Sequence, residues 1–225
     1  MLRRIIEVIG SAILLLLSAP VFLITALAVW ATDYGPVFYR QTRAGIHGRP
    51  FLLLKFRSMR MNDRPVDTPG EIAEGDPLVT AVGRIIRRLK IDELPQLINV
   101  LRGEISWIGP RPTLLEQVER YTPFQRRRLD ILPGMTGWAQ VNGGTEISWP
   151  ERIVLDVWYV ENRTRLLDLQ ILFRTLFVIV RGYKPNVGAL DQALRFAREI
   201  TSEQELALPV APSQHRCDEE LFAHQ

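Results

Sequence analysis

Two adjacent carboxylates, Asp92 and Glu93, lie in the stretch KIDELPQL and follow the basic residues Arg87 and Arg88. The arginines stand five and four residues before Asp92, and nearby cations favour the ionised form of a carboxyl group. An ionised carboxylate beside cations can act as a nucleophile. A neighbouring carboxylate can hold Mg²⁺, which prefers oxygen ligands and binds substrate phosphates as well. The pair therefore has the residue types of a nucleophile, Asp92, and a metal ligand, Glu93.

A helix cap is the structural alternative for the same pair. Pro95 suits the first turn of a helix, because proline lacks a backbone N–H. This placement puts Asp92 near the N-cap and Glu93 in the first turn. Carboxylates there accept hydrogen bonds from free N–H groups and interact favourably with the helix dipole. The two residues alone leave both explanations open.

Basic residues elsewhere in the chain offer candidate phosphate ligands. Arg111 lies between two prolines in the stretch GPRP, and a stiff loop lowers the entropy that an arginine loses when it binds phosphate. Lys55 and Arg57 follow an apolar run, and strand alternation predicts both on one face, with Phe56 opposite. For each of these residues a solvated surface position is the alternative.

The composition fits one domain with appendages. The chain has 225 residues, of which 47% are hydrophobic, so it can bury a core. Its net charge is only +3, but just three of its 28 basic residues are lysines. Arginine suits bidentate phosphate binding, although a GC-rich coding bias explains a high arginine content equally well. The single cysteine, Cys217, excludes an intrachain disulfide and a cysteine-based zinc site.

Residues 8–32 form an uncharged segment long enough to span a bilayer as a helix. Basic residues prefer the cytoplasmic side of a membrane, and they flank this segment at both ends. Pro20 lies in its middle, where a proline removes a backbone hydrogen bond and bends the helix. A bent helix that enters and leaves by the same leaflet satisfies both flanks. An ordinary spanning helix with a proline kink is the alternative.

The rest of the chain has the patterns of an α/β domain with a small sheet and several amphipathic helices. After Pro95, apolar residues recur at helical spacing until Gly103, which is placed to end the helix. The polar segment 61–78 is expected to be a loop. Strands are predicted at 37–40, 51–56 and 105–108, and further helices at 80–90, at 113–129, as a pair within 150–181, and at 188–200.

Several longer stretches, taken in order, resemble the bacterial sugar transferases, the small monotopic phosphoglycosyl transferases that start the assembly of membrane-bound glycans. The resemblance runs from about residue 3 to residue 184. It divides the chain into a re-entrant membrane helix at 1–32, a cytoplasmic phosphoglycosyl transferase domain at 33–184 and a partly disordered tail at 185–225. The matching stretches are GPVFYRQTRAG (35–45), LKFRSM (54–59), IDELPQLINVLRGEISWIGPRP (91–112), LPGMTGWAQVNG (132–143) and LDVWYVENRTRLLDLQIL (155–172).

The resemblance implies an enzyme of the bacterial inner membrane, surrounded in part by membrane lipid, with its amphipathic helices at the interface and its active site on the cytoplasmic face. Such an enzyme transfers a sugar-1-phosphate from a UDP-sugar to a polyprenyl phosphate, such as undecaprenyl phosphate, and releases UMP. The product enters exopolysaccharide or other glycan biosynthesis. The family uses an Asp-Glu pair and Mg²⁺, and its membrane helix is broken at a proline, which Pro20 matches.

Carried onto this chain, the resemblance makes Asp92 the nucleophile that forms a phosphosugar–enzyme intermediate, and Glu93 the Mg²⁺ ligand. Two positions depart from the family pattern. Many relatives have Asn-Gly-Arg where this chain has Asn-Gly-Gly ending at Gly144. If that arginine contacts the nucleotide or sugar, this chain binds its donor differently or uses another residue. Lys90 stands where a small hydroxyl residue is common. Four basic residues match family motifs and are expected to contact phosphate: Lys55, Arg57, Arg87 and Arg111.

Three other functions are alternatives. A catalytically inactive membrane scaffold of a glycan-assembly complex would not need the Asp-Glu pair and the GPRP stretch, and both are present. A membrane-tethered binder of nucleic acid or anionic lipid would use the arginine cluster at 126–128, but the modest net charge and the lack of a known binding motif argue against nucleic acid. A glycosyl transferase that moves the sugar alone would release UDP rather than UMP.

Overall fold

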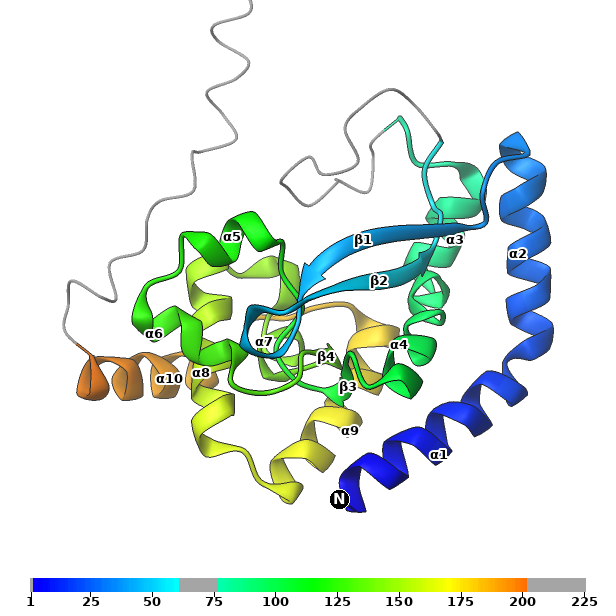
Figure 1. Ribbon diagram of the computed structural model, residues 1–225. Coiled ribbons are helices and arrows are strands. Elements are labelled where there is room, and N and C mark those ends of the chain that lie inside the picture. The colour runs from blue at the N-terminus through cyan, green and yellow to red at the C-terminus, as the bar shows by residue number, and fades with distance from the viewer. Residues whose placement is uncertain (1, 61–76, 202–225) are drawn as a thin grey trace, which may run out of the picture.

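A computed structural model describes residues 2–60 and 77–201, which form a helix-rich body with two small sheets (Figure 1). Most of the loop expected at 61–78 and the polar end of the chain lie outside the described residues. The α-helices are α1 (Leu2–Leu17), α2 (Ala19–Asp33), α3 (Ala81–Arg88), α4 (Gln96–Arg102), α5 (Leu115–Glu119), α6 (Pro123–Arg126), α7 (Trp138–Val141), α8 (Trp149–Asn162), α9 (Arg165–Arg181) and α10 (Val187–Ile200). The strands are β1 (Phe38–Ala44), β2 (Pro50–Phe56), β3 (Ser106–Ile108) and β4 (Gly134–Thr136), and the 3₁₀ helices are η1 (Ile46–Gly48), η2 (Ile91–Glu93), η3 (Arg127–Leu129) and η4 (Gly144–Glu146).

The four strands form two separate two-stranded sheets. Strands β1 and β2 pair as an antiparallel hairpin that sets Tyr39 opposite Lys55, whereas β3 and β4 pair in parallel. The strand predicted at 37–40 extends to Ala44, because it pairs with β2 along its whole length. The prediction of a mixed α/β fold with a small sheet is confirmed in this form.

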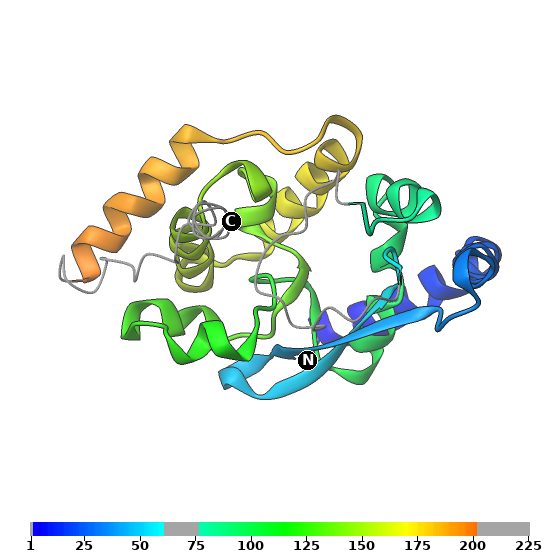
Figure 2. The same cartoon turned by 90° about the horizontal axis from the view of Figure 1, so that it is seen from above.

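The main hydrophobic core lies between α7, α8, α9 and α10. Leu155 and Tyr159 of α8 are fully buried in it. Helix α10 adds Ala189, Ala193 and Ala197, which recur every four residues and so form one small-residue face against α8. The helix predicted at 188–200 is confirmed, and it packs onto the body of the molecule rather than extending from it (Figure 2).

The N-terminal segment is a bent pair of helices, drawn in blue in Figure 1. Helices α1 and α2 meet at 63°, with the break at Ser18 and Pro20 in the first turn of α2. The bend expected from Pro20 is therefore confirmed. Among the described residues, no single helix has the length and hydropathy needed to cross a membrane, but α1 and α2 together have both.

Both helices of the bent pair contact the rest of the molecule. Helix α1 packs along α4. Helix α2 packs on the hairpin through Phe22, whose ring centroid lies 4.7 Å from that of Phe56 and 5.8 Å from that of Phe38. The hairpin thus lies between α2 on one side and the main body on the other.

Candidate active site

The chain around Asp92 and Glu93 is a tight 3₁₀ turn, not the start of an α-helix. Helix α3 ends at Arg88, and Lys90 then takes a left-handed backbone conformation with φ of 56°. The turn η2 carries both carboxylates, and α4 begins only after Pro95 as its N-cap. Neither η2 nor α4 has a side-chain capping hydrogen bond at its start. The helix-cap explanation is therefore wrong, and both carboxylates lie before α4 rather than in its first turn.

The surroundings of Asp92 disfavour the ionised form of its carboxyl group. Its side chain is buried, and no described residue forms a hydrogen bond with its Oδ1 atom. Burial raises the pKa of Asp92, and the negative charge of Glu93 adds to this effect, while the positive charge of Lys55 opposes it. A buried carboxylate oxygen without a donor is poorly stabilised, so it is reactive when ionised.

Glu93 is held by two cations from different parts of the chain. Lys55 Nζ on β2 lies 2.9 Å from Glu93 Oε1, and Arg111 Nη2 in the GPRP loop lies 3.3 Å from the same oxygen. Burial opposes ionisation of Glu93, but the charges of Lys55 and Arg111 outweigh it and hold its pKa well below the usual range. Adjacent residues thus have pKa values that are shifted in opposite directions, which is typical of a functional site.

Arg128 fixes the loop that carries Arg111. Its Nη2 atom donates to the backbone carbonyl oxygen of Arg111 at 3.0 Å, and its Nη1 atom donates to the Tyr121 hydroxyl at 2.7 Å. Its guanidinium also forms an ion pair with Asp156, and both side chains of the pair are almost fully buried. Arg127 pairs with Glu161 at 2.9 Å. The arginine cluster at 126–128 is therefore largely committed to internal pairs, which argues against its use as a binding surface.

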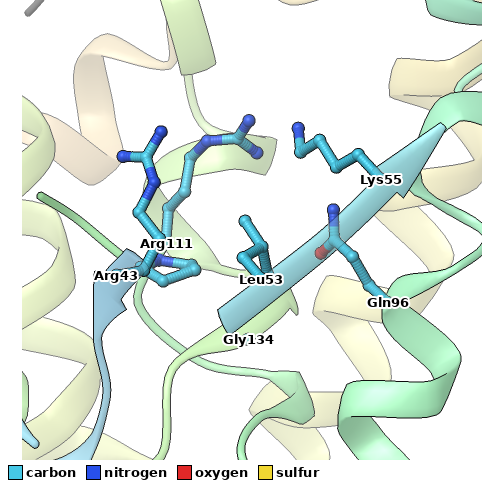
Figure 3. A pocket seen from close by; sticks show the side chains of 7 residues that line it. Arg43, Leu53, Lys55, Gln96, Arg111 and Gly134 are labelled. Carbon is cyan, nitrogen blue, oxygen red and sulfur yellow. The ribbon is translucent and has the colours of Figure 1, made fainter. Parts of the chain in front are cut away.

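A pocket beside Glu93 collects three basic side chains. Arg43 from β1, Lys55 from β2 and Arg111 from the GPRP loop line it together with Gln96 at the start of α4. Figure 3 shows the charged ends of the three basic side chains gathered on one side of the pocket, with Lys55 turned toward the arginines. The sequence analysis did not predict Arg43 as a site residue. The hairpin register carries the signal for it, because β1 sets every second residue, Arg43 included, on the face that carries Lys55.

The other two predicted phosphate ligands lie elsewhere. Arg57 Nη1 donates to an oxygen of Asp33 at 2.9 Å, so its guanidinium joins β2 to the end of α2 instead of facing Glu93 with Lys55. Lys55 and Arg57 thus bind different carboxylates, Glu93 and Asp33. Arg87 Nε donates to Ser58 Oγ at 2.8 Å, and its charge reaches Asp92, whose pKa it lowers. Contacts of Arg57 and Arg87 with phosphate stay predictions.

The two carboxylates offer oxygen atoms, and a hard cation prefers oxygen ligands. No group of three or more His, Cys, Asp or Glu side chains that could hold a metal occurs within residues 2–60 and 77–201. Both cationic contacts of Glu93 go to Oε1, so Oε2 takes part in neither, and Asp92 Oδ1 has no described partner. Mg²⁺ is usually bound by one or two carboxylates together with substrate phosphates. Asp92 and Glu93 fit that arrangement.

Comparisons with known proteins agree with this geometry. Residues 1–182 match the family described as bacterial sugar transferase. An uncharacterized sugar transferase, EpsL, of Bacillus subtilis is 45% identical, over 78% of this chain and 85% of that protein. The UDP-glucose:undecaprenyl-phosphate glucose-1-phosphate transferase of Caulobacter vibrioides is 41% identical, over 77% of this chain and 68% of that protein.

A third relative is much longer than this chain. The undecaprenyl-phosphate galactose phosphotransferase of Salmonella typhimurium is 39% identical over 80% of this chain, but the match spans only 40% of that protein. The family match covers most of the present chain and includes the carboxylate pair, the hairpin and the GPRP loop. The chain therefore belongs to the bacterial sugar transferase family.

Proposed function

We propose that this protein is an initiating phosphoglycosyl transferase. It moves a sugar-1-phosphate from a UDP-sugar to a polyprenyl phosphate and releases UMP, in exopolysaccharide or related glycan biosynthesis. One observation carries the proposal. Asp92 Oδ1 is buried and accepts no hydrogen bond from a described residue, and the neighbouring Glu93 forms ion pairs with Lys55 and Arg111. The names of the Caulobacter and Salmonella relatives, which specify undecaprenyl-phosphate transfer of glucose-1-phosphate and galactose phosphate, support it.

The reaction has two displacements at one phosphorus atom. An oxygen of the Asp92 carboxylate attacks the phosphorus that bears the sugar, and the bond from that phosphorus to the UMP oxygen breaks. UMP leaves with the electron pair, and the sugar phosphate stays on Asp92. A phosphate oxygen of the polyprenyl phosphate then attacks the same phosphorus, and Asp92 leaves as a carboxylate. The product is a polyprenyl diphosphate sugar, and the enzyme is regenerated.

The basic residues around the pocket would neutralise the negative charge of the substrate phosphates. Lys55 and Arg111 keep Glu93 ionised, and the exposed Arg111 is placed to contact phosphate directly. Arg43 and Lys55 add positive charge from the hairpin. Glu93, with the free oxygen of Asp92 near it, would hold Mg²⁺. The ion would neutralise phosphate charge when bound.

Exposed apolar surfaces support a position at the inner membrane. Helix α9 carries exposed apolar residues at helical spacing, which is typical of a helix that lies at a membrane interface. The bent α1–α2 pair also exposes many apolar residues, and its 63° bend fits a re-entrant segment. The Arg57–Asp33 pair joins this segment to the hairpin of the site. The exposed large apolar residues of α9 are Leu166, Leu169, Phe173, Leu176, Phe177, Ile179 and Val180.

The test is release of UMP from a panel of UDP-sugars by the full chain in nanodiscs, with Mg²⁺ and undecaprenyl phosphate. Asp92→Asn is expected to abolish release, and Asp191→Asn, at an exposed carboxylate on α10, serves as the matched control. A sugar phosphate on Asp92, detected by mass spectrometry after quenching without acceptor, is the expected intermediate. Release of UDP instead of UMP would support the glycosyl transferase. Undiminished UMP from Asp92→Asn would refute the nucleophile.

A further inference from the structure

Lys90 carries a positive charge beside the two carboxylates but forms no ion pair with a described residue. Its backbone N–H and carbonyl are tied to the local turn, since its N–H donates to Arg87 and its carbonyl accepts from Glu93 at 3.3 Å. Its Nζ atom instead donates to the Tyr183 hydroxyl at 3.3 Å and lies 5.2 Å from the centroid of the same ring. The hydrogen-bonding partner of the ammonium is therefore a neutral phenol and not a carboxylate.

The ring of Tyr183 packs directly against Gly144, which has no side chain. A Cβ atom on Gly144 would lie 2.2 Å from Tyr183 Cδ1, so only glycine allows the ring to lie this close. The loop of Tyr183 is anchored a few residues later, where Asn186 donates to the side chain of the fully buried Asn142 at 2.8 Å and to its carbonyl at 3.0 Å. The ring is thus positioned by glycine contact and by two hydrogen bonds near it.

This arrangement comes from the end of the chain that the family match does not include. The match ends at residue 182, and Tyr183 is the next residue. The loop that carries Tyr183 leads into α10, which packs on α8. The segment that follows α9 therefore places the Tyr183 ring against Lys90, which lies close to Asp92 and Glu93 in the chain. The charge of Lys90 favours the ionised form of both Asp92 and Glu93, although burial leaves the pKa of Asp92 raised.

We propose that Lys90 binds the diphosphate of the nucleotide donor and that Tyr183, seated on Gly144, is the positioning residue that aims it. The inference rests on the proposed function. A cation beside two carboxylates with only a neutral partner is ready to accept an anion, and a lysine that is already held loses less side-chain entropy when it does so. Lys90 and Tyr183 then add to the donor site that the Lys55–Glu93–Arg111 cluster begins.

The test uses the full chain in nanodiscs with Mg²⁺, and UDP as the probe, titrated calorimetrically. Lys90→Met is expected to raise the Kd of UDP by about tenfold, as the loss of one charged hydrogen bond does, while Lys90→Arg retains most of the affinity. Tyr183→Leu is expected to have a similar effect, and Tyr183→Phe, which keeps the ring, a smaller one. Lys184→Met, at an exposed lysine next to Tyr183, is the matched control and is expected to bind as the wild type does.

A double variant separates positioning from an independent role. If Tyr183 acts through Lys90, Lys90→Met with Tyr183→Leu binds UDP no more weakly than Lys90→Met alone. Losses that multiply in the double variant would overturn the role given to Tyr183. A Lys90→Met protein with the Kd of Lys184→Met would overturn the role given to Lys90. Parallel melting curves show that each variant is folded.

The same titration distinguishes this inference from the proposed function. A wild-type protein that binds UDP and loses affinity in Lys90→Met, but releases no UMP from any donor, supports Lys90 as a diphosphate ligand and contradicts the transferase. A protein that releases UMP with the same donor KM in Lys90→Met and wild type keeps the transferase and excludes Lys90. In an active enzyme, Lys90→Met is expected to raise KM for the donor by about the factor seen in Kd, with a smaller change in kcat.

Discussion

Arg128 donates a hydrogen bond to the backbone carbonyl of Arg111 from a position where almost none of its own side chain is exposed. The buried Arg128 thus supports the backbone of the exposed Arg111. Arg128 is held in turn by Asp156 and Tyr121. The orientation of the GPRP loop, and with it the contact of Arg111 with Glu93, depends on this internal pair.

The first prediction concerns the stability that the Arg128–Asp156 pair provides. Arg128→Met leaves the Asp156 carboxylate buried without its partner, and we expect a loss of about 3–5 kcal/mol in the free energy of unfolding. Removing both charges, in Arg128→Met with Asp156→Leu, is expected to restore most of that loss. Urea denaturation of the protein in detergent, followed by tryptophan fluorescence, measures both effects.

Activity distinguishes a role in positioning from a role in stability alone. The double variant still lacks the hydrogen bond to the Arg111 carbonyl, so UMP release is expected to stay low although stability returns. Wild-type activity in a stable double variant would show that the GPRP loop keeps its place without Arg128.

The second prediction concerns Asp92, whose pKa is raised by burial. A carboxyl whose folded pKa lies above its unfolded pKa binds more protons in the folded state, so it makes stability fall as pH rises through the interval between the two values. At neutral pH the ionised form therefore destabilises the fold. Asp92→Asn removes the charge and is expected to raise Tm at pH 7, while it abolishes UMP release.

The pH dependence provides the control for this prediction. The difference in Tm between Asp92→Asn and wild type is expected to shrink as pH falls from the raised folded pKa of Asp92 to the ordinary aspartate pKa of about 4, below which Asp92 is protonated in both states. In the wild type, UMP release is expected to fall with decreasing pH at a higher pH than for an ordinary aspartate. A difference in Tm that does not change with pH would mean that Asp92 is not destabilised by its charge.

The third prediction compares the two cations on Glu93. Lys55 is the closer and the less exposed partner, at 2.9 Å against 3.3 Å for Arg111. We expect Lys55→Met to cost about 2 kcal/mol at neutral pH, and Arg111→Gln less than about 1 kcal/mol, because the Arg111 pair is more solvated. The pKa of Glu93 is held low in the folded state, so the stability that these pairs provide is present above the unfolded pKa and is lost as pH falls toward the folded one.

The order of Lys55→Met and Arg111→Gln is expected to differ between their effects on activity and on stability. Arg111 is exposed and is placed to reach phosphate, so Arg111→Gln is expected to lower kcat/KM by about 100-fold, in spite of its small effect on stability. Denaturation curves at about pH 3 and pH 7, on either side of the ordinary glutamate pKa, and steady-state UMP release measure the two properties. Equal ranking in both would mean that Arg111 acts only through Glu93.

Local patterns predicted much of the fold. The apolar stripe after Pro95 gave α4, and Gly103 ends it with a left-handed φ of 82° as expected. The hairpin and α10 were also predicted. The helix expected at 113–129 is broken instead, because Thr122 and Pro123 start a new helix with its own cap. These residues carry the signal for that break.

The arrangement of the site depends on contacts that no local pattern reports. The 3₁₀ turn at Asp92 follows from the left-handed conformation of Lys90, which a lysine rarely adopts. Arg128 was predicted as part of a basic cluster, but tertiary contacts with Tyr121 and Asp156 bury it. Arg43 joins the pocket through strand register. The residue types were enough to predict a nucleophile, a metal ligand and phosphate ligands. Which basic groups contact Glu93 depends on long-range packing.

The last prediction concerns Gly144, where the sequence departs from the family pattern. Gly144 has a φ of 54°, and an added Cβ would collide with the Tyr183 ring. Gly144→Ala is therefore expected to displace Tyr183 and to weaken UDP binding as far as Lys90→Met does, with no further loss when the two are combined. Gly182→Ala is the control, since its φ of 77° also makes alanine strained there but a Cβ would meet nothing within 4 Å. If both alanine variants lose stability but only Gly144→Ala loses affinity, the ring contact matters for binding. If they lose affinity equally, backbone strain in this region explains the effect, and Gly144 has no special place in the donor site.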